Sequence, residues 1–527
     1  MIPINKVLLS SLIAATLLGG SSVSAAGLSA DALFTSNGQI MADVSTLAGT
    51  GDFKDVNGAA LSSAFRSPSG VLTLSDGSLL VADSRDHLVR KVSAGQVTTY
   101  AGPDLAVNLN AQGFPIGGLL NGKASEAFFN EPVGLAVDAQ GNVYAADSSN
   151  HAVRKINASG QVTTLAGNGV VGNIDGSGGD ARFNHPTDVA AAADGTVYVA
   201  DTLNHVIRKI TAAGIVTTLN AGSDRGIEVR PGEAAIAGDF KDGNLKDAKF
   251  NEPSGLTLDA KGNLYVSDTG NQRIRYIDLS AGVVSTVAGS GVTEKGALYA
   301  AGNFADGDAL KASFDFPKGI TVTSEGGLLI ADSLNHSVRY LLNGKVSTIA
   351  GNTVTGETNG IESKATLYNP TDVAVAKDGS IIVADVYNNK IRKITPYKLP
   401  AALPKDNNIK VVYADQVISF EAQPEFTNER TMVPVRAISE ALGYTVKYTE
   451  LAGLKTIQLI NGNITIELYI GKTGIKRVEK GKADIAMNTD VSPYVKSDLT
   501  YVPVRFFAEQ VGLDVQWDQT TQTAIIR

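Results

Sequence analysis

The feature that most constrains this chain is a unit that occurs six times along it. One copy reads EPVGLAVDAQGNVYAADSSNHAVRKINASGQVTTLAG. Its four β-rich runs are separated by turn residues, which predicts four antiparallel strands in each copy. A Pro opens the first strand of every copy, at Pro68, Pro132, Pro186, Pro253, Pro317 and Pro370.

The two ends of the array predict how the repeats close. The sixth copy stops at IRKITPYK without a fourth strand, whereas VSTLAG at 44–49 is an extra copy of that strand. A lone four-stranded unit cannot bury both faces, but a radial array can, and ring closure removes the exposed edges. We therefore expect a mainly β fold, a six-bladed β-propeller over residues 40–397 whose N-terminal strand completes the last blade.

The unit resembles the NHL repeat, named for an Asn-His-Leu stretch in the frame of DHLVR and NHAVR here. The resemblance covers all six copies and implies a six-bladed propeller. Some members of that family bind proteins or RNA, and some relatives are enzymes, such as metal-dependent amidating lyases. The resemblance therefore leaves both binding and catalysis open.

A second repeated element precedes each opening Pro. It reads DGSGGDARF or DGNLKDAKF in two copies, where Asp-Gly suits a tight turn. The segments upstream of it are long and unlike one another. Its last residue is apolar, and we expect it to plug between neighbouring blades at Phe65, Phe129, Phe183, Phe250, Phe314 and Leu367.

The frame Asp-x-x-Asn-His-x-x-Arg raises the question of scaffold or chemistry. His87, His151, His205 and His336 occupy it in four copies, but Gln272 and Asn389 replace His in the others. Gln and Asn cannot act as bases, yet they are planar hydrogen-bond donors like His. Because a group present in every blade serves the blade, we interpret the frame as scaffold; metal binding or acid–base chemistry is the alternative.

The propeller channel holds the candidate metal ligands. The residue two positions after the opening Pro is Gly in four copies but Asp188 and Asp372 in the third and sixth, which face each other across a six-membered ring. The hypothesis is that Asp188 and Asp372 line one mouth of the channel and hold a cation. The alternative is strand-start capping, since a hard cation prefers six or more oxygen ligands. No catalytic residue and no cofactor is indicated.

The N-terminus predicts export. Lys6 precedes the apolar run VLLSSLIAATLLGG and the small residues of SSVSAAG, a pattern typical of a cleaved signal peptide over residues 1–26. The alternative is a single membrane anchor, for which the run is short. No second hydrophobic span follows, so we expect no membrane span after cleavage. With no Cys in 527 residues, thiolate chemistry and disulfides are excluded.

The C-terminal part predicts a second domain. PYKLPAALPKDNN contains a linker at 398–408, and residues 409–527 carry a two-fold repeat, RTMVPVRAISEALGYTVKY and LTYVPVRFFAEQVGLDVQW. In each half a short helix is expected to begin at Pro434 or Pro503 and to end at Gly443 or Gly512. Strand patterns flank both helices, which predicts a smaller α+β domain.

This second repeat resembles the copper amine oxidase N-terminal-like domain of exported proteins. The paired VPVRAISEALG and VPVRFFAEQVG carry the resemblance. The copper chemistry of the namesake family belongs to a separate catalytic domain with His ligands. Because no His follows His336, copper catalysis in this second domain is excluded.

Together these patterns predict an exported binding or scaffold protein, secreted or at the cell surface. Its expected partner is an extracellular protein or a cell-wall polysaccharide, bound on the propeller face that carries the long linkers. Net charge is −8 without a Lys/Arg cluster, so no nucleic acid partner is expected. A metal-dependent lyase- or lactonase-like enzyme is the alternative, and a purely structural surface protein is a third possibility.

Overall fold

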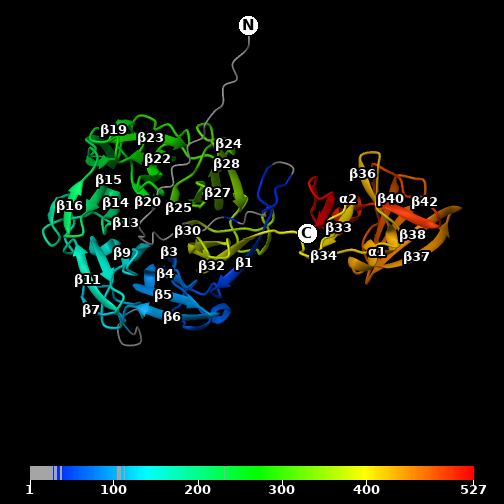
Figure 1. The fold of residues 1–527 in the computed structure, drawn as a ribbon, viewed down its shortest axis with the longest axis horizontal. Helices are drawn as coiled ribbons and strands as arrows, with labels where there is room; N and C mark the ends of the chain where they lie inside the picture. The colour runs from blue at the N-terminus through cyan, green and yellow to red at the C-terminus, as the bar shows by residue number, and fades with distance from the viewer. Residues whose placement is uncertain (1–27, 29–31, 36–37, 104–108, 112, 231) are drawn as a thin grey trace, which may run out of the picture.

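The computed structural model describes residues 28–527 except 29–31, 36–37, 104–108, 112 and 231. The predicted signal peptide at 1–26 lies outside the described residues. Six antiparallel sheets form a ring, and a smaller β-rich domain with two short helices lies beside it (Figure 1). Neither of these two helices is long and apolar enough to cross a membrane.

Each sheet of the ring is one blade. The blades are numbered 1 to 6 in the order in which their innermost strands occur in the sequence. The innermost strands are β3 (Pro68–Thr73), β8 (Pro132–Val137), β13 (Pro186–Ala191), β20 (Pro253–Leu258), β25 (Pro317–Val322) and β30 (Pro370–Val375). The second strands are β4 (Leu79–Asp83), β9 (Val143–Asp147), β14 (Val197–Asp201), β21 (Leu264–Asp268), β26 (Leu328–Asp332) and β31 (Ile381–Asp385). The third strands are β5 (Leu88–Ser93), β10 (Ala152–Ile156), β15 (Val206–Ile210), β22 (Arg273–Asp278), β27 (Ser337–Leu342) and β32 (Lys390–Pro396).

The fourth strands confirm the predicted closure of the ring. They are β6 (Gln96–Ala101), β11 (Gln161–Ala166), β16 (Ile215–Thr218), β23 (Val283–Ala288), β28 (Lys345–Ala350) and, in blade 6, β1 (Ala42–Ala48). β1 comes from the N-terminal side and pairs with β32, so that Val44 lies opposite Ile394. Closure pairs the first strand of the propeller with its last, as the displaced VSTLAG copy predicts.

Each blade has a fifth strand where we expected only a tight turn. These outer strands are β2 (Gly58–Ala59), β7 (Gly122–Lys123), β12 (Gly176–Ser177), β19 (Gly243–Asn244), β24 (Gly307–Asp308) and β29 (Gly360–Ile361). Each pairs with the fourth strand of its own blade. They are only two residues long, too short for the alternating pattern by which a strand is recognised in sequence.

A buried ion pair occupies the same place in all six blades. The Asp that ends the second strand lies 2.5–2.9 Å from an Arg of the third strand, and both side chains are fully buried. In five blades the guanidinium also lies 4.9–5.4 Å over the predicted plug Phe, which is fully buried and packs against the neighbouring blade. The Asp–Arg pairs are Asp83–Arg90, Asp147–Arg154, Asp201–Arg208, Asp268–Arg275, Asp332–Arg339 and Asp385–Arg392.

The Asp of each pair accepts further hydrogen bonds. In blade 3, Asp201 accepts from the backbone N–H of Asn184 at 2.7 Å and from Asn204 Nδ2 at 2.8 Å. Burial nevertheless raises the pKa of Asp201 to about 6, and these donors, with Arg208, oppose that shift. Buried carboxylates need such donors, because an unpaired buried charge is destabilising.

Blade 1 departs from this arrangement at one position. Asp86 replaces the Asn that, in the other five blades, donates to the Asp of the buried Asp–Arg pair. Asp86 is fully buried, its oxygens accept no hydrogen bond from the described residues, and Arg66 Nη1 lies 3.4 Å away. Burial, followed by repulsion from Asp55, raises the pKa of Asp86 to about 6.

The second domain contains three sheets around one apolar core. The first is β33 (Lys410–Tyr413), β34 (Gln416–Val417), β44 (Val515–Asp518) and β45 (Thr523–Ile526). The second is β35 (Glu425–Thr427), β36 (Arg430–Pro434), β42 (Tyr494–Lys496) and β43 (Leu499–Pro503). The third is β37 (Thr445–Leu451), β38 (Leu454–Asn461), β39 (Ile464–Tyr469), β40 (Gly474–Glu479) and β41 (Ile485–Asn488).

The two repeats of this domain pair with each other. β36 and β43 are antiparallel, with Val433 opposite Val502. The helices α1 (Val435–Ala441) and α2 (Val504–Gln510) begin one residue after the expected prolines, because Pro434 and Pro503 end these strands. Gly443 and Gly512 follow the helices with φ of 79° and 80°, the left-handed conformation expected of a C-terminal glycine.

The Asp86→Asn variant should be more stable than the natural chain by roughly 1–3 kcal/mol, because the amide supplies the missing donor. Since the folded pKa of Asp86 lies above that of an unfolded Asp, its destabilising effect grows as pH rises through about 6. The gain should therefore be largest above pH 6 and smallest near pH 4. Chemical denaturation across this pH range measures it.

Asn204→Asp in blade 3 is the matched control, since it places a carboxylate, as at Asp86 of blade 1, where an Asn is natural. It should lower the unfolding free energy over the same pH range. Equal stability of Asp86→Asn and the natural chain at pH 8 would contradict the assignment.

Candidate functional site

The His, Gln or Asn of each frame joins one blade to the next. All six residues have φ of 48–58°, which aims their side chains at the neighbouring blade. Each accepts a hydrogen bond from the backbone N–H that precedes the next opening Pro, at 2.6–3.2 Å. The donor–acceptor pairs are Glu131–His87, His185–His151, Glu252–His205, Phe316–Gln272, Asn369–His336 and, across the closure, Ser67–Asn389.

The same side chains also hold the linkers, as the donor role predicts. Gln272 Nε2 donates to Ala300 O and Asn389 Nδ2 donates to Gly51 O, both at 3.1 Å. His87 and His205 hydrogen-bond the backbone of Pro115 and Ile236. The acceptor role was missed from sequence because it depends on where the next blade places its N–H.

Burial lowers the pKa of all four frame histidines below the usual 6.5. Neutral imidazole keeps an acceptor nitrogen, and protonation would place a proton on it. Their geometry is therefore that of structural hydrogen-bonding groups.

Asp188 and Asp372 border a cavity of about 970 Å³ in the centre of the ring. A ring of six apolar residues from the innermost strands lines this channel, namely Val71, Leu135, Val189, Leu256, Ile320 and Val373. Burial, then repulsion from Asp372, raises the pKa of Asp188. Burial raises the pKa of Asp372 to about 7.

Each of the two carboxylates accepts hydrogen bonds from backbone N–H groups of two blades. Asp188 accepts from Val189 N–H of its own strand at 2.8 Å and from Leu256 N–H of blade 4 at 2.7 Å. Asp372 accepts in the same way from Val373 and from Val71 of blade 1, both at 2.8 Å. These contacts fit the capping alternative and extend it across a blade boundary.

The Gly in the blade before each Asp has a steric cause. A Cβ on Gly134 would lie 2.1 Å from Asp188 Oδ1, and one on Gly319 would lie 2.1 Å from Asp372 Oδ1. The glycines of blades 2 and 5 therefore make room for the carboxylates of blades 3 and 6. In the described part of the chain, no group of three or more acidic or His side chains is placed to hold a metal ion. Cation binding by Asp188 and Asp372 stays a prediction.

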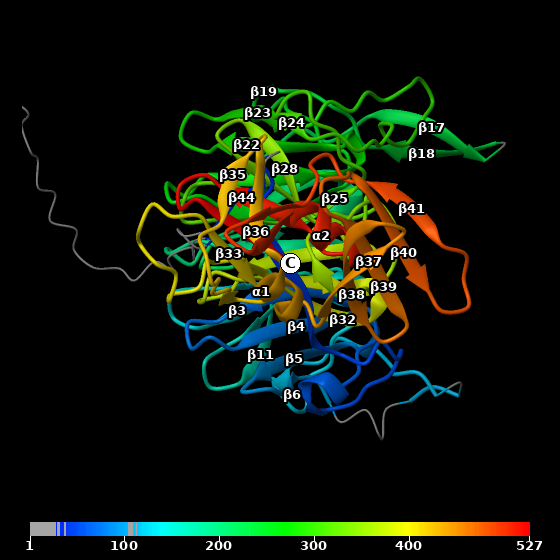
Figure 2. The same ribbon diagram turned by 90° about the vertical axis from the view of Figure 1, so that its right-hand side faces the viewer.

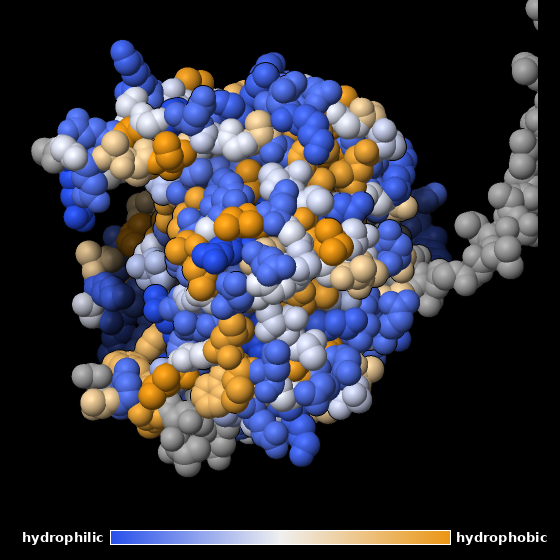
Figure 3. Space-filling model, turned by 90° about the vertical axis from the view of Figure 1, so that its left-hand side faces the viewer, coloured by the Kyte–Doolittle hydropathy of each residue, from blue (hydrophilic) through white to orange (hydrophobic). Residues whose placement is uncertain are grey.

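The inter-blade linkers form one face of the propeller. Linkers are numbered by the blade that follows them, and linkers 4 and 5 are residues 219–252 and 289–316. Linker 4 contains a hairpin, β17 (Arg225–Arg230) and β18 (Glu233–Ala237), that projects beyond the ring (Figure 2). In Figure 3 this face lies on the left, where two projections flank a hollow and orange patches lie among blue.

Exposed apolar side chains come from every linker. They include Phe53, Val56, Phe114, Ile116, Val170, Ile174, Ile236, Phe240, Val292, Leu298 and Val354. Exposed apolar side chains mark an interaction surface where they form a contiguous patch. The sequence showed that the linkers are long and unequal, but not which of their apolar residues stay exposed.

Comparison with protein families gives two matches. The NHL repeat model matches residues 129–156, 183–210, 250–275 and 367–394, and the copper amine oxidase N-terminal domain model matches residues 412–526. The chain is thus an NHL-repeat β-propeller protein. Its second domain is a copper amine oxidase N-terminal domain, and that domain contains no His.

Curated relatives share the propeller part. Over 290 residues, 53% of this chain and 26% of the relative, it is 31% identical to Protein SUPPRESSOR OF QUENCHING 1, chloroplastic, of Arabidopsis thaliana. It is 27% identical to NHL repeat-containing protein 2 of Gallus gallus over 408 residues, 70% of this chain and 52% of the relative. The chain spans about half or less of the length of these relatives.

Solved structures with related architecture include an auxiliary nutrient binding protein from Bacteroides ovatus ATCC 8483. It has 14% identity, a TM-score of 0.47 and coverage of 70% of this chain and 83% of that one. Virginiamycin B lyase from Staphylococcus aureus has 13% identity, a TM-score of 0.39 and coverage of 67% and 98%.

His205→Gln should leave stability nearly unchanged, because Gln272 makes the equivalent bonds in blade 4. His205→Leu should lower the unfolding free energy by roughly 1–3 kcal/mol, because it leaves the Glu252 N–H without an acceptor. Chemical denaturation at pH 8 compares the two variants.

The pH dependence separates the natural chain from His205→Gln. Since the folded pKa of His205 is below 6.5, the unfolded chain binds a proton first as pH falls. The stabilising contribution of His205 is complete above pH 6.5 and declines below it, whereas Gln does not titrate. Parallel stability curves for the two proteins between pH 8 and pH 5 would contradict this role.

Proposed function

We propose that this chain is an exported, non-catalytic binding protein whose propeller presents its inter-blade linkers to a protein or a cell-wall glycan. The observation that carries the proposal is the face just described, where exposed apolar side chains project from every linker. Loops on a rigid scaffold are the usual carriers of recognition. The N-terminal signal-like pattern supports a site of action outside the cell or at its surface.

The construction of this face supports binding. The linkers are held to the blades by frame residues, as at Gly51 and Ala300, so that little order has to be gained on association. Phe53 and Phe114 come from different linkers, and both rings lie 5.8 Å from the guanidinium of Arg66. Arg66 thus links two exposed aromatic side chains of different linkers, and aromatic side chains of this kind provide affinity at interfaces.

The channel gives less support to the enzyme alternative. Both oxygens of Asp188 and of Asp372 already accept backbone N–H groups, and the ring beside them is apolar. Metal analysis of the purified chain separates the two classes, because a tightly held stoichiometric metal would favour the enzyme.

Phe53→Ser combined with Phe114→Ser should weaken binding to the envelope target by about tenfold or more, as expected for interface aromatics. The probes are insoluble peptidoglycan in a sedimentation assay and solubilised envelope proteins in a pull-down. The midpoint of thermal unfolding should change little, because both rings are half exposed.

Ile215→Ser is the matched control. Ile215 is similarly exposed, at 44%, but it begins the fourth strand β16, outside the linkers. Its binding should equal that of the natural chain. Equal losses in both variants, or binding that neither variant affects, would contradict a linker-face site.

A further inference from the structure

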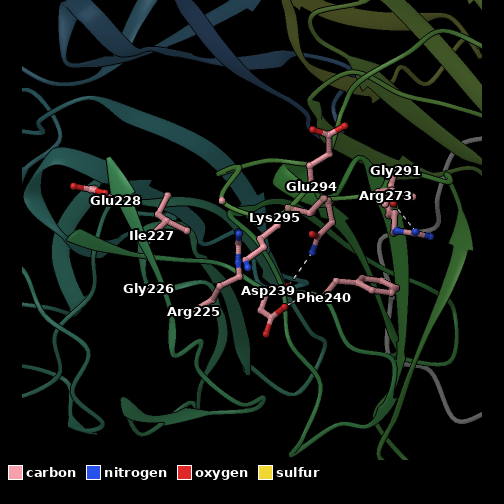
Figure 4. Close-up of a pocket in the computed structure, with 14 residues that line it drawn as sticks. Arg225, Gly226, Ile227, Glu228, Asp239, Phe240, Arg273, Gly291, Glu294 and Lys295 are labelled. Carbon is pink, nitrogen blue, oxygen red and sulfur yellow. Dashed lines mark hydrogen bonds between the residues drawn. The ribbon is translucent and has the colours of Figure 1, made fainter. Parts of the chain in front are cut away.

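A cleft of about 600 Å³ lies between the hairpin of linker 4 and a segment of linker 5 (Figure 4). Residues 225–228 of β17 form one wall and residues 291–296 form the other, while Asp239, Phe240, Asn271 and Arg273 complete the lining. The cleft is separate from the central channel, with which it shares no lining residue.

The strand β17 lines the cleft with its hydrogen-bonding edge and not with one of its faces. Four consecutive residues of β17 line it, whereas a strand that presented a face would contribute alternate residues. No residue of β18 lines the cleft, so this edge is the one directed away from β18. β17 and β18 form a two-stranded sheet by themselves, and the described residues supply no strand to pair with that edge. Its backbone groups are available to another chain.

The two walls are fixed relative to each other. The guanidinium of Arg225 donates to Gly238 O at 2.6 Å and, across to linker 5, to Ala297 O at 2.6 Å and Leu298 O at 2.9 Å. The ring of Phe240 is held by Arg273, at 4.4 Å, and remains 39% exposed. A rigid edge and an exposed ring lower the cost of ordering on binding.

Gly226 has no role in the fold that requires glycine. Its φ is not left-handed, and a Cβ there would meet no atom within 4 Å. Glycine inside a strand costs stability and often marks the approach of another backbone. The open space at Gly226 adjoins the cleft, because Gly226 is part of its lining.

The charges around the cleft disfavour an anionic polymer. Arg225 and Arg273 donate to backbone carbonyls, at Gly238 and Gly291 among others. Of the other exposed charged residues in the lining, Glu228 and Glu294 are acidic and Lys295 is basic, which leaves a small excess of negative charge. A neutral or basic chain suits this rim.

We propose that the cleft binds an extended polypeptide segment, whose backbone pairs with the free edge of β17 and whose apolar side chain covers Phe240. This mode adds one strand to an existing sheet, with affinity from main-chain hydrogen bonds and specificity from alternate side chains. The inference rests on the proposed binding function and names a substrate class for one part of the linker face.

The test begins with a displayed library of random linear peptides, selected on the full-length chain. Selected peptides should bind Gly226→Val at least tenfold more weakly, because the branched side chain fills the open space beside the cleft where the peptide backbone approaches. Gly222→Val is the matched control: Gly222 lies in the same linker with equally open space but outside the cleft lining. It should bind like the natural chain, and both variants should unfold near the natural temperature.

Backbone N-methylation of a selected peptide supplies the second measurement. Strand pairing uses the N–H of every second residue at one edge, so methylation at alternate positions should reduce affinity tenfold or more, and methylation between them should have little effect. Selection of no peptide sensitive to Gly226→Val, or an effect of methylation without alternation, would overturn the proposal.

The outcome also separates this inference from the proposed function. Loss of envelope binding in Phe53→Ser/Phe114→Ser together with peptide binding unaffected by Gly226→Val would reject the strand-pairing site alone. Envelope binding unaffected by the Phe substitutions would reject the proposed linker-face function instead.

Discussion

The buried Asp–Arg pair is the interaction on which the propeller depends. A buried ion pair stabilises a fold only when further hydrogen bonds compensate for the lost water. Here Asp201 accepts from Arg208, Asn204 and the backbone of Asn184, and Arg208 also donates to carbonyls of the preceding linker, at Arg182 and Ile174. One pair thus ties the second and third strands of a blade to the linker that leads into it.

The plug Phe and the frame residue extend this order from one blade to the next. The Phe lies against the Arg of its own blade and packs on its neighbour, and the frame residue accepts an N–H across the same boundary. Both ends of a linker are fixed in this way, so the segment between them is free to vary. The hairpin in linker 4 is an insertion of this kind.

The repeats predict much of the fold but little of its surface. Six blades, the displaced β1 and the plug residues follow from a pattern that occurs in every copy. The two-residue outer strands lack any such pattern. The contacts of Arg225 with Ala297 and of Asp188 with Leu256 join segments far apart in sequence, so no local signal reveals them. The opposition of Asp188 and Asp372 was predictable because position within the repeat fixes position in the ring.

The second domain completes the closure of that ring. Arg527 donates to both oxygens of Glu362 at 2.8 Å, and Glu362 accepts the N–H of Ala42, the first residue of β1. Arg527 also lies 5.2 Å over Tyr397, which packs with Met41 and Ile525 in a small apolar cluster. Since Arg527 and Glu362 are almost fully buried, separating the domains would leave Glu362 without its partner beside the closing strand. A strand that closes the ring without a covalent neighbour in its blade is thereby held by contacts from two domains.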